Sequence, residues 1–121
     1  SEGALLYLGD GHAVQGDGEL CGVAIEFSTV TRMTLDLVKG WGLDWPRLEN
    51  DEFIMSIGSA RPREDAARIA YADLVGWMVD SYGFDRWEAY MLLTQIGKVR
   101  LGNMVDPNYT VGASIAKRYL P

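Results

Sequence analysis

The sequence predicts an α+β fold, in which strands are followed by two helices and then by short C-terminal strands. Between residues 21 and 37 apolar side chains alternate with polar ones, which is typical of half-buried strands. Between residues 66 and 78 apolar side chains recur every three or four positions, which is typical of an amphipathic helix. Strand-like segments return after Gly97.

The N-terminal half is predicted to consist mainly of strands. A bend near residues 28–31 separates two alternating segments, because Val30 breaks the phase of the first one. Residues 40–46 form a loop, and Gly58 ends the last strand of this half. The strands expected here are, in order, residues 4–8, 21–27, 33–37 and 52–57.

Two helices are predicted next. The first begins near Pro62, since proline is tolerated in the first helical turn, and ends before Gly83. The second begins at Asp85, whose spacing from Glu88 is that of a capping box, and ends at Gly97. The apolar positions that define the buried face of the first helix are Ala66, Ile69, Ala70, Leu74, Trp77 and Met78.

The C-terminal segment is predicted to return to strands, at 99–105 and 110–115, with a turn at 106–109 between them. A chain of this length fits one domain, and we expect residues 1–121 to form it. Nearly half of the residues are apolar, so the chain can bury a core without a disulfide or a structural metal.

Composition excludes several classes of partner. The net charge of −6 argues against nucleic acid and against an anionic membrane surface, because both require a basic face. No segment has the length and apolarity of a membrane span or the pattern of a signal peptide. A single cysteine excludes an internal disulfide and fits a reducing compartment, so we expect a cytoplasmic protein.

The loop from Gly9 to Cys21 concentrates the chemically reactive side chains of the chain. It contains the only histidine and the only cysteine. Four glycines allow sharp turns, so that polar side chains can converge. The polar residues are Asp10, His12, Gln15, Asp17, Glu19 and Cys21.

This loop can be interpreted as a metal site. Asp10 and His12 are two positions apart, so in an extended segment both point to one side and can bind a single ion. Asp17 and Glu19 offer a further ligand or a general base, and Gln15 can donate to an oxyanion. A base near a metal-activated water is what amide hydrolysis requires.

Structural interpretations of the same residues stay open. The carboxylates can accept hydrogen bonds from backbone N–H groups in tight turns, and His12 can bond to a carbonyl. The spacing matches neither a zincin helix, nor an EF-hand, nor a dinucleotide-binding loop. Cys21 is a candidate nucleophile, but it opens an apolar segment, and we expect a buried thiol.

Three other groups have a chemical and a structural interpretation. Lys39 and Lys98 are candidate bases, but each lies beside a glycine at the end of an element, and we expect solvated side chains. Asn103 and Asp106 can line a pocket or stabilise a turn, and the turn is the preferred interpretation.

Several segments in the same order resemble the acetamidase/formamidase family. The loop 9–22 is similar to the signature of that family, and the similarity continues through four later segments, namely 56–62, 70–74, 82–84 and 102–107. The resemblance implies hydrolysis of formamide or acetamide to ammonia and a carboxylate, with a divalent metal ion, zinc being expected and calcium possible. It implies that Asp10 and His12 bind the metal and that Gln15, Asp17 and Glu19 complete the catalytic pocket, with Glu19 as the base.

The resemblance covers only the C-terminal part of that family, whose members are typically much longer. The resemblance implies that the strands between residues 4 and 57 are antiparallel strands of a β-sandwich and that the upstream part supplies further ones. The strands predicted here would then lack neighbours and leave an edge unpaired. We therefore expect that the missing N-terminal half, or a second copy of the chain, covers that edge. The alternatives to a metal-dependent amidase are a non-catalytic interaction or small-ligand-binding module and a thiol-dependent amidase that uses Cys21.

Overall fold

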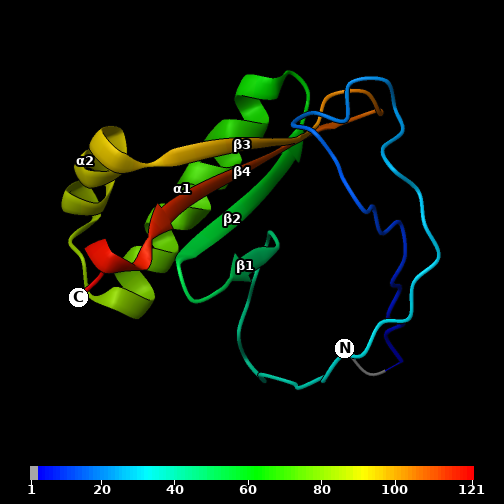
Figure 1. Cartoon of the computed structure of the whole chain (residues 1–121). Coiled ribbons are helices and arrows are strands. Elements are labelled where there is room, and N and C mark those ends of the chain that lie inside the picture. The colour runs from blue at the N-terminus through cyan, green and yellow to red at the C-terminus, as the bar shows by residue number, and fades with distance from the viewer. Residues whose placement is uncertain (1–2) are drawn as a thin grey trace.

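A four-stranded antiparallel sheet with the strand order β1-β2-β4-β3 forms the centre of the computed structural model, which describes residues 3–121 (Figure 1). The helix α1 packs against β2 and β4, and α2 packs against α1. The predicted α+β class is confirmed. The strands are β1 (Arg47–Glu49), β2 (Phe53–Ala60), β3 (Lys98–Asn103) and β4 (Tyr109–Ala116), and the helices are α1 (Arg63–Tyr82), α2 (Arg86–Ile96) and the short 3-10 helix η1 (Lys117–Tyr119).

The core lies between the sheet and α1. Alternate residues of β2 are buried, so Ile54, Ser56 and Gly58 face the helix. The prediction that Gly58 ends this strand is wrong, because β2 continues past it to Ala60. The buried cluster consists of Ile54, Ala70, Leu74, Val75, Trp77, Met78, Ala89, Leu93, Ala113 and Ile115.

Both helices begin and end close to the predicted positions. Pro62 is the N-cap of α1, and Gly83 ends it with a φ of 70°, the left-handed conformation that glycine adopts without steric cost. The side chain of Asp85 accepts hydrogen bonds from the N–H groups of Trp87 and Glu88, and Glu88 accepts one from Asp85. The predicted capping box is therefore confirmed.

Replacing Asp85 by alanine is expected to lower the free energy of unfolding by about 1 kcal/mol, because two N–H groups of the first turn of α2 lose their acceptor. Urea denaturation followed by circular dichroism measures the change. Asp85→Asn is the matched control, since asparagine caps helices as well as aspartate does. Equal losses for both variants would contradict a role through capping.

The C-terminal strands confirm the prediction. β3 and β4 pair in antiparallel register, with an irregularity between Leu101 and Asn103. The bulged end of β3 and the turn that follows it lie next to the N-terminal loop in Figure 1. This end of the sheet is where the candidate site is built. Neither helix of the described residues has the length and apolarity needed to cross a membrane.

The N-terminal arm, residues 3–45, differs from the prediction. It runs as an open loop outside the sheet (Figure 1), and the strands predicted at 4–8, 21–27 and 33–37 are not formed there. The single bridge in the arm joins His12 and Glu26. The alternation along the chain shows which side chains suit a sheet, but a strand also requires a neighbour to accept and donate its backbone hydrogen bonds. Among the described residues, the segment 21–27 pairs only briefly with residues 12–14, and the segments 4–8 and 33–37 pair with no strand.

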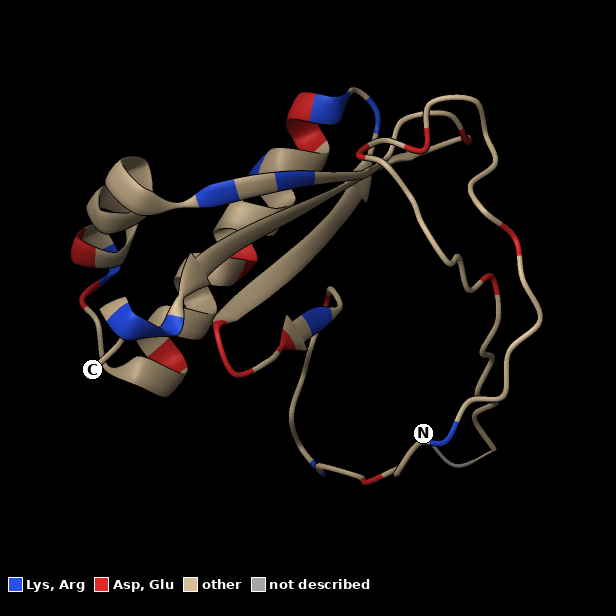
Figure 2. Cartoon of the chain, in the orientation of Figure 1, with Lys and Arg blue, Asp and Glu red and all other residues tan. Residues whose placement is uncertain are grey.

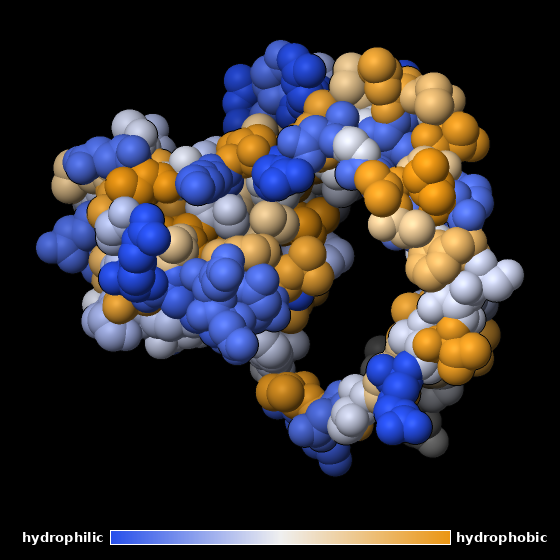
Figure 3. Space-filling view, viewed as in Figure 1, coloured by the Kyte–Doolittle hydropathy of each residue, from blue (hydrophilic) through white to orange (hydrophobic). Residues whose placement is uncertain are grey.

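The apolar side chains of the arm are largely exposed, as the orange patches along the ring-shaped part of Figure 3 show. Leu5, Ile25 and Leu35 expose 76%, 58% and 68% of their surface. Exposed apolar surface of this extent is unusual on a monomeric protein.

Candidate metal centre

Two short stretches of the arm lie antiparallel and bring distant residues together. The N–H of Ala13 donates to the carbonyl of Ile25 at 2.9 Å, and the N–H of Ile25 donates to the carbonyl of Val14 at 3.0 Å. This pairing places Glu26 beside His12. Residues separated along the chain thus contribute to one site.

The loop is held against the end of the sheet through Gly18. Its N–H donates to the carbonyl of Leu101 at 2.8 Å, and its carbonyl accepts from the N–H of Met104 at 3.0 Å. Gly18 is buried with a φ of +87°, and a Cβ there would lie 2.8 Å from the sulfur of Met104. The left-handed conformation therefore favours glycine at this position. The crowding involves only the flexible side chains of Met104 and Leu101.

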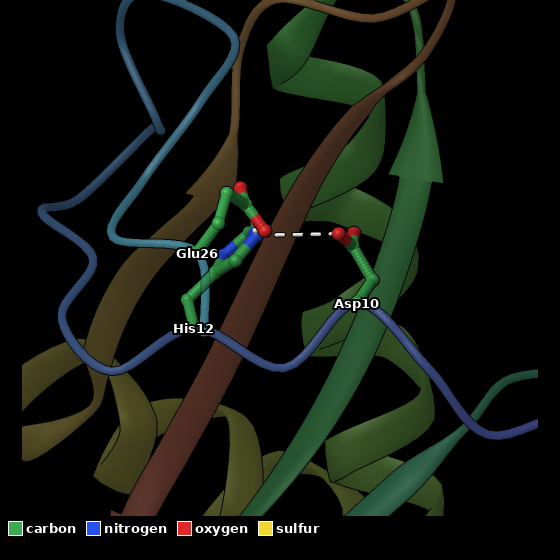
Figure 4. A group of neighbouring side chains, drawn as sticks. All are labelled: Asp10, His12 and Glu26. Carbon is green, nitrogen blue, oxygen red and sulfur yellow. Dashed lines mark ion pairs between the residues drawn. The ribbon is translucent and has the colours of Figure 1, made fainter. Parts of the chain in front are cut away.

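Three carboxylates lie near one nitrogen of the imidazole, and Figure 4 shows two of them, Asp10 and Glu26. The Nε2 atom of His12 lies 3.0 Å from Oε1 of Glu26 and 3.2 Å from Oδ1 of Asp10. Oε1 of Glu19 is 3.8 Å away. The ligand atoms of Asp10, His12 and Glu26 all lie within 4.8 Å of one another. We call these three residues the candidate metal centre.

The chemistry of this donor set fits a cation. Nε2 of His12 is buried and makes no hydrogen bond of acceptable geometry with any residue that the structure describes, although two carboxylate oxygens are close to it. Ligand atoms bound at about 2.1 Å to a tetrahedral ion lie roughly 3.4 Å apart. The two separations from Nε2, 3.0 and 3.2 Å, are slightly shorter than that value and are also typical of an ion pair, and all three ligand atoms lie within 4.8 Å of one another.

The surroundings of His12 favour positive charge. The hydrogen bond between its Nδ1 and Gln15 contributes most to raising the pKa of the imidazole above 6.5, and burial acts in the opposite direction. The carboxylates of Glu26, Asp10 and Glu19 raise the pKa further, in that order. Because the same negative charges attract any cation, a metal ion and a proton compete for this position.

Two of the acidic residues have left-handed backbone conformations. Asp10 has a φ of 56° and Glu19 a φ of 47°. This conformation costs about 1–2 kcal/mol for a residue other than glycine. The carboxylates of Asp10 and Glu19 both lie near the imidazole of His12. Strained backbone conformations of this kind cluster at functional sites.

The other predicted site residues have different surroundings. Gln15 lies on the opposite side of the ring, with its Oε1 2.7 Å from Nδ1 of His12. The carboxylate of Asp17 pairs with the guanidinium of Arg100, at 2.6 Å from Nη2 and 3.0 Å from Nε. Figure 2 shows basic residues along β3 and acidic residues scattered along the arm, and this ion pair joins the two.

Cys21, Lys39 and Lys98 are all exposed. The thiol of Cys21 is exposed and donates to the carbonyl of Val23 at 3.4 Å, so the prediction that it is buried is wrong. Its apolar neighbours in the chain lack the opposing layer that would bury them. Lys39 and Lys98 are exposed, as predicted.

Asn103 and Asp106 bond to each other in the turn after β3. The amide nitrogen of Asn103 donates to Oδ2 of Asp106 at 2.6 Å, which agrees with the predicted role in a turn. Oδ1 of Asn103 is buried and has no hydrogen-bond partner among the residues that the structure describes.

Sequence reasoning missed Glu26. It occupies the polar phase of the alternating segment 21–27, and nothing in its immediate neighbourhood suggests a ligand. The antiparallel pairing of residues 12–14 with residues 25–26 was the information required, and that pairing depends on two segments separated by a loop.

Comparison with known proteins gives consistent matches. The sequence profile of the acetamidase/formamidase family matches residues 1–118. An acetamidase from Yersinia enterocolitica is 64% identical over 91% of this chain, with a TM-score of 0.88. An acetamidase from Bacillus halodurans is 26% identical over 89% of the chain, with a TM-score of 0.71. No curated protein matches the chain.

A third solved structure shares the fold. A predicted acetamidase/formamidase from Thermoanaerobacter tengcongensis is 24% identical over 88% of the chain, with a TM-score of 0.72. In all three comparisons the match covers only 33–37% of the other chain, so this chain spans about a third of the length of these solved relatives.

Proposed function

The chain belongs to the acetamidase/formamidase family, and from this membership we propose that its candidate metal centre serves the hydrolysis of short aliphatic amides, such as formamide and acetamide, to ammonia and a carboxylate. The observation that supports this proposal most strongly is the buried Nε2 of His12, which faces carboxylates and makes no hydrogen bond with the described residues.

Asp10, His12 and Glu26 would hold the ion. One imidazole nitrogen and carboxylate oxygens favour zinc, whereas calcium prefers a shell made only of oxygen. A divalent ion in this position would lower the pKa of a bound water and polarise an amide carbonyl.

Glu19 is the proposed general base. Its side chain is 13% exposed, and its oxygen lies 3.8 Å from Nε2 of His12, so it borders the candidate metal centre without displacing Glu26 or Asp10. It would accept a proton from water as the water oxygen adds to the amide carbonyl carbon. The C–N bond then breaks and the proton passes to the leaving nitrogen, which departs as ammonia. The catalytic roles of Gln15 and Asp17 stay predictions.

We further propose that the arm is covered by a partner surface in the working enzyme. The match to the Yersinia acetamidase includes 91% of this chain, more than residues 46–121 alone can provide, so it extends into the arm. The arm thus follows a path found in a protein about three times as long. Companion strands, or a second copy of the chain, would pair with the alternating apolar segments.

Zinc binding is the first test of the proposal. Isothermal titration of the full chain with zinc should give a specific site, and His12→Ala and Glu26→Gln should each weaken it by more than about tenfold, because a direct ligand matters at least as much as an outer-shell partner. Glu64→Gln, which removes an exposed carboxylate of α1, is the matched control and should bind like the wild type.

Ammonia release from formamide and acetamide, measured with and without chelator, is the second test. Turnover that chelation and His12→Ala both abolish supports the metal-dependent amidase. Zinc binding without turnover supports the non-catalytic binding module instead. Turnover that survives chelation but is lost on alkylation of Cys21 would favour the thiol-dependent alternative.

A further inference from the structure

We propose that Gln15 is a positioning residue, which fixes the tautomer of His12 so that the lone pair of Nε2 faces the candidate metal centre. The amide of Gln15 bridges two groups. Its Nε2 donates to the carbonyl of Gly102 at 2.9 Å, and its Oε1 lies 2.7 Å from Nδ1 of His12.

The orientation of the Gln15 amide follows from chemistry. A backbone carbonyl can only accept hydrogen bonds, so the NH₂ end of the amide must face Gly102. The carbonyl end must then face the imidazole, and a carbonyl oxygen also can only accept. Nδ1 of His12 therefore carries the hydrogen of this bond.

The consequence for the other ring nitrogen is direct. A neutral imidazole has one N–H and one lone pair, so a hydrogen on Nδ1 leaves the lone pair on Nε2. Nε2 is the atom that lies 3.0 Å from Glu26 and 3.2 Å from Asp10. A ring with the opposite tautomer would direct an N–H at these carboxylates and could not bind a cation through Nε2.

The strand β3 provides the carbonyl group that orients the amide of Gln15. Gly102 follows Leu101 in β3, and Leu101 also binds the backbone of Gly18. The acceptor that orients Gln15 therefore belongs to the bulged end of β3 and not to the arm. This arrangement resembles the outer-shell carbonyl groups that fix histidine ligands in metal sites.

Nuclear magnetic resonance on the full chain tests the proposal, since His12 is the only histidine and its ring signals need no assignment. Long-range proton–nitrogen spectra at alkaline pH, where imidazole is neutral, report the tautomer. The wild type is expected to show the hydrogen on Nδ1. Gln15→Met, which keeps the length of the side chain but removes both hydrogen bonds, should populate the tautomer with the hydrogen on Nε2.

Zinc titration of the same samples is the second readout. Gln15→Met should lower the affinity by about 10–100-fold, as loss of an outer-shell partner does. Gln15→Glu retains an acceptor for Nδ1 and should restore the tautomer. Gln95→Met changes the only other glutamine, which is exposed on α2, and should alter neither measurement.

The result separates this inference from the function on which it partly rests. A wild-type ring with its hydrogen on Nε2, or a Gln15→Met variant with an unchanged tautomer, would overturn the positioning role. So would an unchanged zinc affinity of Gln15→Met when the wild type does bind zinc. A Gln15-dependent tautomer in a chain that binds no zinc would leave Gln15 as the residue that orients His12 and would overturn the candidate metal centre alone.

Discussion

Replacing Asp73 by alanine is expected to lower the free energy of unfolding by about 3–5 kcal/mol, because it leaves a buried guanidinium without its partner. The carboxylate of Asp73 accepts hydrogen bonds from Nε and Nη2 of Arg47 at 2.8 and 2.9 Å, and one from the hydroxyl of Ser56. The side chains of Arg47 and Asp73 are only 10% and 13% exposed. The pair joins β1, β2 and α1, so its loss affects the whole sheet.

Urea denaturation provides the measurement, and the chain offers a matched control. Asp65 and Arg68 also form an ion pair on α1, but their side chains are 46% and 75% exposed. Asp65→Ala should therefore change the free energy of unfolding by less than about 1 kcal/mol. Similar losses for the two alanine variants would contradict the importance of burial.

The dependence of the free energy of unfolding on pH provides a second check on the contribution of Asp73. Burial raises the pKa of Asp73, but the hydrogen bonds from Arg47 and Ser56 and the charge of Arg47 together lower it by more, so that it lies below 3.8. A depressed pKa stabilises the fold above the pKa of the unfolded state, and the contribution is lost as the pH falls through the folded value. The difference in stability between the wild type and Asp73→Asn should therefore narrow below about pH 4.

Gly58→Ala is expected to cost about 3 kcal/mol or more, through close contact between β2 and α1. A Cβ at Gly58 would lie 2.9 Å from the backbone nitrogen of Ala70 and 3.0 Å from Cβ of Ile69, and nearer still to the carbonyl oxygen of Ala66. Since two of these three atoms belong to the helix backbone, relief requires α1 to move away from the sheet. Thermal and urea denaturation measure the loss.

The same substitution within α1 is the control. A Cβ at Gly76 would meet no heavy atom within 4 Å. Gly76→Ala should therefore leave the fold intact and stabilise it by up to about 1 kcal/mol, because alanine has the higher helix propensity. A Gly58→Ala variant as stable as Gly76→Ala would contradict the close approach of helix and strand.

The C-terminal part of the fold was predictable because its signals are local. Asp85 and Glu88 satisfy the first turn of their own helix, and Gly83 ends the preceding one, so these boundaries depend on neighbouring residues alone. The segments 21–27 and 33–37 have an equally clear alternation, but they form no strand among the residues that the structure describes. Periodicity identifies a segment suited to a sheet and does not identify its neighbours.

The candidate site was predictable to a similar extent. Asp10 and His12 are two positions apart and do lie together. The position of Glu26 beside His12 depends on the pairing of two segments of the arm. The ion-pair partner of Asp17 is Arg100, which lies far along the chain in β3. Such contacts depend on the tertiary structure, and the spacing of residues in the loop does not predict them.

The arm has few backbone hydrogen bonds, whereas each residue of β2 pairs with β4. Hydrogen exchange should therefore be fast at most amides of the arm and slow in β2, since protection reflects the free energy of local opening. A variant can accordingly melt like the wild type and yet have lost the geometry around His12. Proteolysis or exchange within residues 3–45, and not the melting temperature, is the assay that reports on the integrity of the candidate site.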